Sequence, residues 1–172
     1  MSMAATTFKL KTLTTEALPA AIKRAAHYRN LNEPSPAESI CLDVLEVDPE
    51  NQQALVTLLL ALTDQFAHYT SILFKKACEI LPRLEDEYSQ LYYEGIIWER
   101  RAQALAAQST LSSNHKAYHG YCQAMELFEK ASAIRPPDID DAILHWNSCA
   151  RTLMRKQELQ PAPDESFETW LE

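Results

Sequence analysis

The sequence predicts an all-α protein, and its composition and the spacing of its apolar residues are the observations behind this prediction. Only 2 of the 172 residues are glycine, against a usual share of about 7%, and the tight turns of sheet proteins need glycine. From residue 16 to residue 157, apolar side chains recur at intervals of three and four, the period of an amphipathic helix. We therefore expect helices joined by short connections, several of them marked by proline.

Four helices are expected in the first half of the chain. Ser35 and Pro36 suit the N-cap and first turn of the second helix, because serine accepts a backbone hydrogen bond there and proline has no N–H to satisfy. Asp48 and Pro49 end that helix. The third helix is apolar on nearly all sides, so it should be the most buried element. The expected ranges are 20–31, 36–47, 52–66 and 70–81.

Three more helices are expected in the second half of the chain. Glu85, Asp86 and Glu87 supply an acidic first turn, which the helix dipole favours. Residues 109–114 are polar and are interpreted as a loop, and Pro136 ends the sixth helix. The expected ranges are 85–108, 116–134, and from 138 or 140 to 156. A flexible arm, 1–15, and an acidic tail, 158–172, should flank one helical repeat domain, 16–157.

Three segments of the chain are similar to one another, and each closes with a proline. In QAMELFEKASAIRP, which closes at Pro136, a small residue, an aromatic and an alanine lie twelve, eight and five positions before the proline. AESICLDVLEVDP, closing at Pro49, and TSILFKKACEILP, closing at Pro82, align with it. Self-similarity of this kind is typical of helical repeats, in which stacked helix pairs bury a continuous core. The matched positions are Ala37, Cys41 and Val44; Thr70, Phe74 and Ala77; and Ala124, Phe128 and Ala131.

The pattern resembles the second helix of the tetratricopeptide repeat (TPR) family, which carries a small residue, an aromatic, an alanine and a closing proline. The third copy matches all four positions, the second copy three and the first copy two. Over about residues 17–156, the resemblance implies a right-handed α-α superhelix, a TPR-like solenoid of about three helix pairs with a C-terminal capping helix. It also implies a concave wall, built from the first helix of each pair, that binds peptides.

The third helix pair departs from the family's length. Pro49 and Pro82 are 33 residues apart, close to the family period of about 34, whereas Pro82 and Pro136 are 54 apart. We therefore expect both helices of the third pair to be elongated, by roughly two or three turns each. In the expected long hairpin, Gly95, Ala102 and Ala106 would face Gly120, Ala124 and Ala131.

Several functional classes are disfavoured by the sequence. The formal net charge of −8 argues against an extended nucleic-acid surface. The motifs HExxH and GxSxG and a Walker loop are missing, so we expect neither an enzyme nor a cofactor. The longest apolar run, 54–62, is too short to span a bilayer, and no secretory leader is visible. The spacing of Cys41, Cys78, Cys122 and Cys149 suits neither a disulfide framework nor a zinc site, which predicts buried thiols in a cytoplasmic protein.

The register of the TPR resemblance implies a set of groove positions for a partner. Tyrosine and arginine are frequent interface anchors, and arginine grips carboxylates at two points, so an acidic or carboxylate-ended peptide is the expected ligand. The alternative is that these arginines form a solvated helix face. The family's carboxylate clamp for chaperone tails is missing, because Ile22, Ala26 and Thr57 occupy its positions. The candidate groove residues are Thr57, Leu60, Asp64, Tyr92, Tyr93, Ile96, Glu99, Arg100, Asn147, Arg151 and Arg155.

Two weaker patterns complete the list of candidate sites. Phe167, Trp170 and Leu171 would share one face of a short helix, as helix-in-groove ligands do, so the tail is a candidate for docking on its own or a neighbouring groove. The alternative is a tail without a stable contact. His115, His119 and Cys122 follow one helix face and form a weak metal pattern, for which a structural role near the hairpin tip is the favoured interpretation.

Together these patterns favour a non-catalytic adaptor that binds a protein or peptide in a concave helical groove. The alternative is a structural subunit or homo-oligomer within a larger complex, and a helical enzyme without a recognisable motif is the least favoured class. Neither nucleic acid nor membrane is expected as a partner, and self-association through the C-terminal tail is a further expectation.

Overall fold

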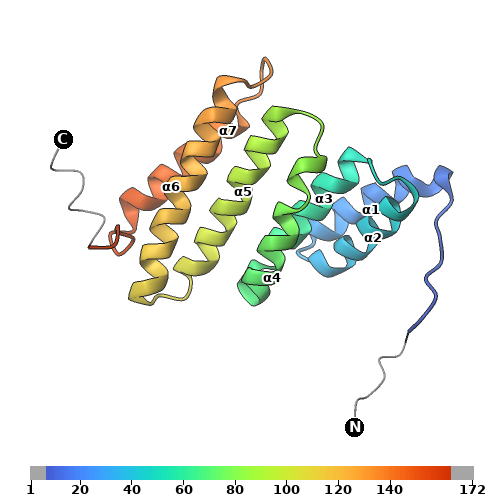
Figure 1. The fold of residues 1–172 in the computed structure, drawn as a ribbon, viewed down its shortest axis with the longest axis horizontal. Coiled ribbons are helices and arrows are strands. Elements are labelled where there is room, and N and C mark those ends of the chain that lie inside the picture. Colours follow the sequence, from blue (N-terminus) through green and yellow to red (C-terminus); the bar gives the residue numbers. More distant parts are fainter. Residues whose placement is uncertain (1–6, 164–172) are drawn as a thin grey trace, which may run out of the picture.

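The computed structural model describes residues 7–163, except for the side chain of Tyr69, and every regular element in this part of the chain is a helix (Figure 1). The α-helices are α1 (Leu18–Asn30), α2 (Pro34–Val47), α3 (Gln52–Thr63), α4 (Phe66–Cys78), α5 (Glu87–Ala106), α6 (Leu111–Ala133) and α7 (Asp141–Arg155). Two single-turn 3-10 helices, η1 (Thr15–Ala17) and η2 (Leu81–Arg83), precede α1 and α5. Within 7–163, no helix is long and apolar enough to cross a membrane.

Side-chain caps fix the start of three helices. The side chain of Asn51 accepts a hydrogen bond from the Ala54 N–H at 3.0 Å and begins α3. Asp86 does the same for α5, at 2.8 Å from the Ser89 nitrogen. Thr110 begins α6 with a reciprocal pair of bonds to Ser113. Each cap satisfies an N–H that the helix itself leaves without a partner.

Several of the predicted boundaries are wrong. Ser35 is not the N-cap of α2, because that helix already begins at Pro34 and its N-cap, Glu33, makes no side-chain cap bond. The break between α3 and α4 falls at Asp64 and Gln65 rather than near residue 68, so α4 begins at Phe66. The predicted loop over 109–114 is also wrong, because Leu111 already belongs to α6. Serine, threonine and asparagine are frequent both in loops and at helix N-termini, and here they cap the helix.

The helices pack in chain order. Each α-helix contacts the next along the chain, and α3 also contacts both α1 and α5. Figure 1 shows the resulting row, with α1 and α2 at one end and α6 and α7 at the other. The row has two main core clusters, which we call the N-terminal core, around α1 to α4, and the C-terminal core, around α5 to α7. Leu60 and Tyr93 pack against both cores.

The third helix pair is elongated, as predicted. Helices α5 and α6 contain 20 and 23 residues, whereas α3 and α4 contain 12 and 13. Small residues allow their close approach: a Cβ added at Gly120 would lie 3.1 Å from the Cβ of Ala102. Gly95 does not face another small residue, since a Cβ there would lie 2.6 Å from the Phe128 ring. The α5–α6 contact is thus a mixture of small-residue and aromatic packing.

Burial bears out the prediction for α3 and corrects the one for the cysteines. In α3, 7 of the 12 residues are buried. Cys41 and Cys149 are buried thiols, but Cys78 and Cys122 are only partly buried. The cysteine prediction failed for these two because they lie at the edge of the apolar face of their helices, where helical spacing alone does not separate core from boundary.

Candidate functional site

Side chains from alternate helices are linked on one side of the row. Asp64, which follows α3, accepts a bond from Arg29 Nε of α1 at 2.8 Å and from Arg100 Nη1 of α5 at 3.0 Å. The Asp64 side chain is only 16% exposed, so it is screened less than a surface carboxylate. This bridge, which we call the Arg–Asp–Arg bridge, connects α1, α3 and α5 and holds two guanidinium groups in place.

A second polar link joins α5 to α7. His145 Nδ1 lies 2.7 Å from Glu99 Oε2, and the Glu99 side chain is 4% exposed. Cys149 lies one turn beyond His145, near the Glu99 carboxylate. Burial and then the neighbouring Glu99 carboxylate raise the pKa of the Cys149 thiol, so this sulfur stays neutral. Glu99 therefore works as an internal anchor for α7.

A pocket of about 400 Å³ opens beside these two links. Five of its six lining residues carry a polar or charged group, and the exposed side chain of Leu144 adds an apolar edge. Arg151 and Arg155 are exposed and continue the α7 face that carries Leu144 and Ser148, because residues three and four apart lie on the same side of a helix. We call this the α5–α7 pocket; its lining residues are Glu99, Arg100, Gln103, Leu144, His145 and Ser148.

The predicted groove residues divide into a polar set near this pocket and an apolar set in the core. Ile96 is 3% exposed and belongs to the C-terminal core, so it packs rather than facing a partner. Tyr92 stacks on Tyr88, with ring centroids 5.7 Å apart, and meets Tyr93 edge-on at 5.0 Å. Burial raises the pKa values of Tyr92 and Tyr93, as expected for rings that serve in packing.

The remaining predicted positions have mixed surroundings. The Thr57 hydroxyl donates to the Gln53 carbonyl at 2.7 Å, within its own helix. Leu60 is partly buried between the two cores, and Asn147 is partly buried on α7. The structure brings together Asp64, Glu99 and Arg100 but leaves Thr57 outside both polar links. Arg151 and Arg155 stay exposed on α7.

Sequence reasoning missed Arg29 and His145. Arg29, Asp64 and Arg100 are separated by 35 and 36 residues, close to one repeat period, so a search for charges one period apart would have found the bridge. His145 lies 46 residues from its partner Glu99, and a single helical histidine carries no pattern that could reveal it.

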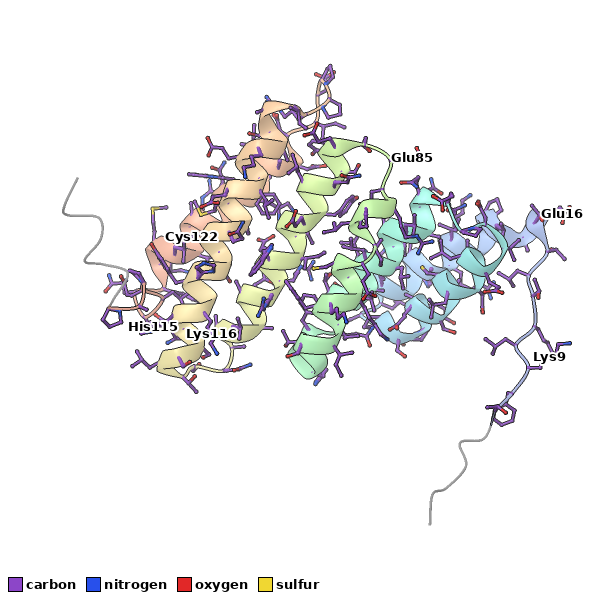
Figure 2. All side chains as sticks on the ribbon, in the orientation of Figure 1. Lys9, Glu16, Glu85, His115, Lys116 and Cys122 are labelled. Atoms are coloured by element: carbon purple, nitrogen blue, oxygen red, sulfur yellow. The ribbon has the colours of Figure 1, made fainter. Side chains whose placement is uncertain are left out.

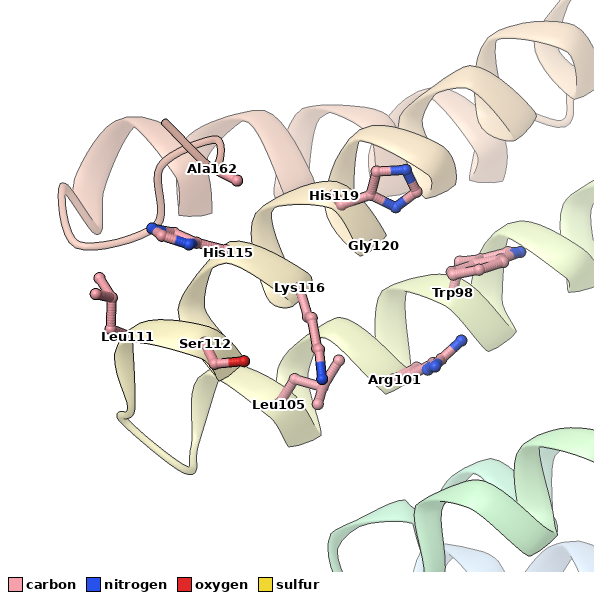
Figure 3. A pocket seen from close by; sticks show the side chains of 10 residues that line it. All are labelled: Trp98, Arg101, Leu105, Leu111, Ser112, His115, Lys116, His119, Gly120 and Ala162. Carbon is pink, nitrogen blue, oxygen red and sulfur yellow. The ribbon is translucent and has the colours of Figure 1, made fainter. Parts of the chain in front are cut away.

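A larger groove lies at the tip of the α5–α6 hairpin, with a volume of about 600 Å³ (Figure 3). Figure 3 shows Ala162 beside His115 at one end of the groove and Trp98 toward the other. Arg101 places its guanidinium carbon 4.4 Å from the centre of the Phe74 ring and 5.2 Å from that of Trp98. We call it the hairpin-tip groove; its lining residues are Trp98, Arg101, Leu105, Leu111, Ser112, His115, Lys116, His119, Gly120 and Ala162.

The weak metal pattern does not form a ligand set. In residues 7–163, no group of three or more His, Cys, Asp and Glu side chains is placed to hold a metal ion. His115 and Cys122 lie at different levels of α6 (Figure 2). The His119 ring instead meets the Trp98 ring, at a centroid distance of 6.5 Å.

The predicted tail anchors Phe167, Trp170 and Leu171 lie outside the described residues. Comparisons of the chain with protein-family models, with curated proteins and with solved structures found no match.

Proposed function

We propose that this chain is a non-catalytic adaptor that binds the carboxylate groups of an acidic or carboxylate-ended peptide. The proposal includes a TPR-like right-handed superhelix, with α1, α3, α5 and α7 forming its concave wall. The observation that carries the proposal is the α5–α7 pocket, with Arg100 in its lining and Arg151 and Arg155 on the adjoining face.

The repeat spacing of the Arg–Asp–Arg bridge supports a wall made of alternate helices. Residues one period apart occupy equivalent positions in a repeat protein, and side chains at equivalent positions line the same surface. Arg29, Asp64 and Arg100 meet this condition with separations of 35 and 36. The Glu99–His145 link then extends the same surface from α5 to α7.

The charges of this surface suit a carboxylate. Arg151 and Arg155 make no ion pair within the described part of the chain, so their guanidinium groups are available to a ligand. Arginine binds a carboxylate through two parallel hydrogen bonds, which a lysine cannot do. The chain has a net charge of −8, but Arg151 and Arg155 form a local basic surface that attracts a peptide carboxylate.

The buried links preorganise that surface. Asp64 already fixes the guanidinium of Arg100, and Glu99 fixes the ring of His145. Side chains that are ordered before binding lose less conformational entropy when the ligand arrives. Leu144, which is 63% exposed at the pocket edge, supplies an apolar contact for a neighbouring ligand side chain.

A peptide-binding experiment tests this proposal. Peptides with a free C-terminal carboxylate, selected from a random display library on the full chain, are measured again after C-terminal amidation and against Arg151→Glu/Arg155→Glu. Each hydrogen bond to a charged group contributes about 1.5–3 kcal/mol, so we expect binding at least about tenfold weaker in the variant.

The matched control is Lys75→Glu/Lys130→Glu. Both lysines are exposed and lie on α4 and α6, which are not part of the proposed wall, and the charge change is the same. Selected peptides that bind the Arg151→Glu/Arg155→Glu protein as tightly as the wild type would contradict the proposal. A stable dimer in light scattering that Arg151→Glu/Arg155→Glu dissociates would favour the structural-subunit alternative.

A further inference from the structure

We propose that the acidic segment 164–172 of the same molecule occupies the hairpin-tip groove. The groove is separate from the α5–α7 pocket, so this inference does not depend on the proposed adaptor function. It assigns an occupant to a groove of about 600 Å³ in the described part of the chain.

The lining of the groove combines positive charge with apolar surface. Arg101 and Lys116 are cationic, His115 and His119 add two imidazoles, and no lining residue is acidic. Leu111 is 73% exposed at the groove edge, and Trp98 and Leu105 are only partly buried. On a protein with an excess of acidic residues, a pocket without any carboxylate is suited to an acidic ligand that also carries apolar side chains.

Segment 164–172 has this chemistry. It reads DESFETWLE, with four acidic residues and no basic one. Phe167, Trp170 and Leu171 are spaced three and four apart, the spacing with which a helical ligand presents its anchors to a groove. The segment therefore offers acids to Arg101 and Lys116 and apolar rings to Trp98 and Leu111.

The chain leads directly from the folded domain to the groove. Leu159 is buried in the C-terminal core, and Ala162 lines the groove itself, so the segment 164–172 is tethered two residues beyond a lining residue. From Leu105 to Trp98 the groove follows α5 for about 10 Å, at 1.5 Å per residue. Nine residues span about 13 Å as a helix and about 30 Å when extended, so either conformation reaches the far end.

Tethering explains why a weak contact would suffice. A short linker gives the tethered ligand an effective concentration in the millimolar range. A segment whose affinity for the groove is only about 0.1 mM would then be bound in roughly nine molecules of ten. A second copy of the chain, at micromolar concentration, competes poorly against such an intramolecular ligand.

Hydrogen–deuterium exchange on the full-length chain tests this inference. We expect the amides of 164–172 to exchange at least about fivefold more slowly in the wild type than in Lys116→Glu or Trp170→Ala. Lys116 is exposed, so its substitution leaves the core intact, and Lys130→Glu on the same helix is the charge-matched control. The protection should not change between 1 and 100 µM protein.

Two results would overturn the inference. Equal exchange of 164–172 in the wild type, Lys116→Glu and Trp170→Ala would show that the groove does not hold the segment. Protection that increases with protein concentration would show that the ligand comes from a second copy. Neither result concerns the arginines of α7, so the proposed adaptor function is tested independently by the peptide-binding experiment.

Discussion

At the residue scale, the Arg–Asp–Arg bridge depends on Asp64. Its carboxylate is bonded to two arginines from two different helices, and it lies where the proposed peptide wall would be centred. Because its side chain is mostly buried, the loss of its charge would leave two guanidinium groups close together without compensation. Asp64 therefore couples the stability of the row to the geometry of the proposed binding surface.

We expect Asp64→Asn to lower the free energy of unfolding by about 1–2 kcal/mol, because the amide keeps only one of the two oxygens that accept from Arg29 and Arg100 and places an NH2 group where the other was. Urea denaturation followed by circular dichroism measures this change. Glu46→Gln, an equivalent charge removal at an exposed site on α2, should shift the free energy by less than about 0.5 kcal/mol. If the two variants were equally stable, the Arg–Asp–Arg bridge would make no net contribution.

At the scale of elements, the α5–α6 hairpin depends on two glycines with different surroundings. A Cβ at Gly95 would meet three atoms of the Phe128 ring at 2.6–3.0 Å, and that ring is fully buried. A Cβ at Gly120 would meet the Ala102 Cβ at 3.1 Å, which a small displacement of the helices relieves. The same substitution should thus have different effects at the two sites.

Both Gly→Ala changes gain about 1 kcal/mol of helix propensity, so the difference between them isolates the packing contribution. Overpacking costs about 1–3 kcal/mol, and we expect Gly95→Ala to be less stable than Gly120→Ala by at least about 1 kcal/mol. Chemical denaturation of both variants under the same conditions measures the difference. Equal stabilities would mean that the Phe128 ring moves aside without cost.

At the scale of the whole molecule, both cores contain ionisable groups that must stay neutral. Burial raises the pKa of Cys41, in the N-terminal core, from 9.0 to about 12. In the C-terminal core, burial and then the nearby Cys149 and Glu99 raise the pKa of Tyr121 from 10.0 to about 12. Both cores should therefore lose stability at alkaline pH, where these groups begin to ionise.

A raised pKa means that the folded state favours the neutral form of the group. The group's contribution to the free energy of unfolding is therefore complete below its pKa in the unfolded chain, and it is lost as the pH rises to its pKa in the folded protein. We expect the melting temperature to be constant from pH 7 to 9 and to fall between pH 9 and 12. Thermal melts by circular dichroism test this expectation. In Tyr121→Phe, the part of the fall between pH 10 and 12 should be shallower, and an unchanged slope would exclude a contribution from Tyr121.

Much of the helical architecture follows from local sequence. The near absence of glycine, the apolar spacing and the proline positions predicted seven helices in the right order, and Pro82 and Pro136 predicted the elongated third pair. The predicted start of α6 failed because serine is frequent both in loops and in helix caps. Ser113, which the prediction assigned to a loop, is a capping residue of α6. Local patterns determine that a helix forms, but competing hydrogen bonds decide its first turn.

The sequence by itself thus determined the helix content, the order of the helices and the unusual length of α5 and α6, because these depend on interactions between residues a few positions apart. Only the tertiary structure decided that Asp64 joins Arg29 to Arg100, that Glu99 is buried against His145, and that Ile96 packs inside. Those outcomes depend on the rotation of each helix about its axis, which is set by packing against neighbours distant in the chain. Helical periodicity identifies an apolar face, but it does not specify which polar groups at the edge of that face will meet.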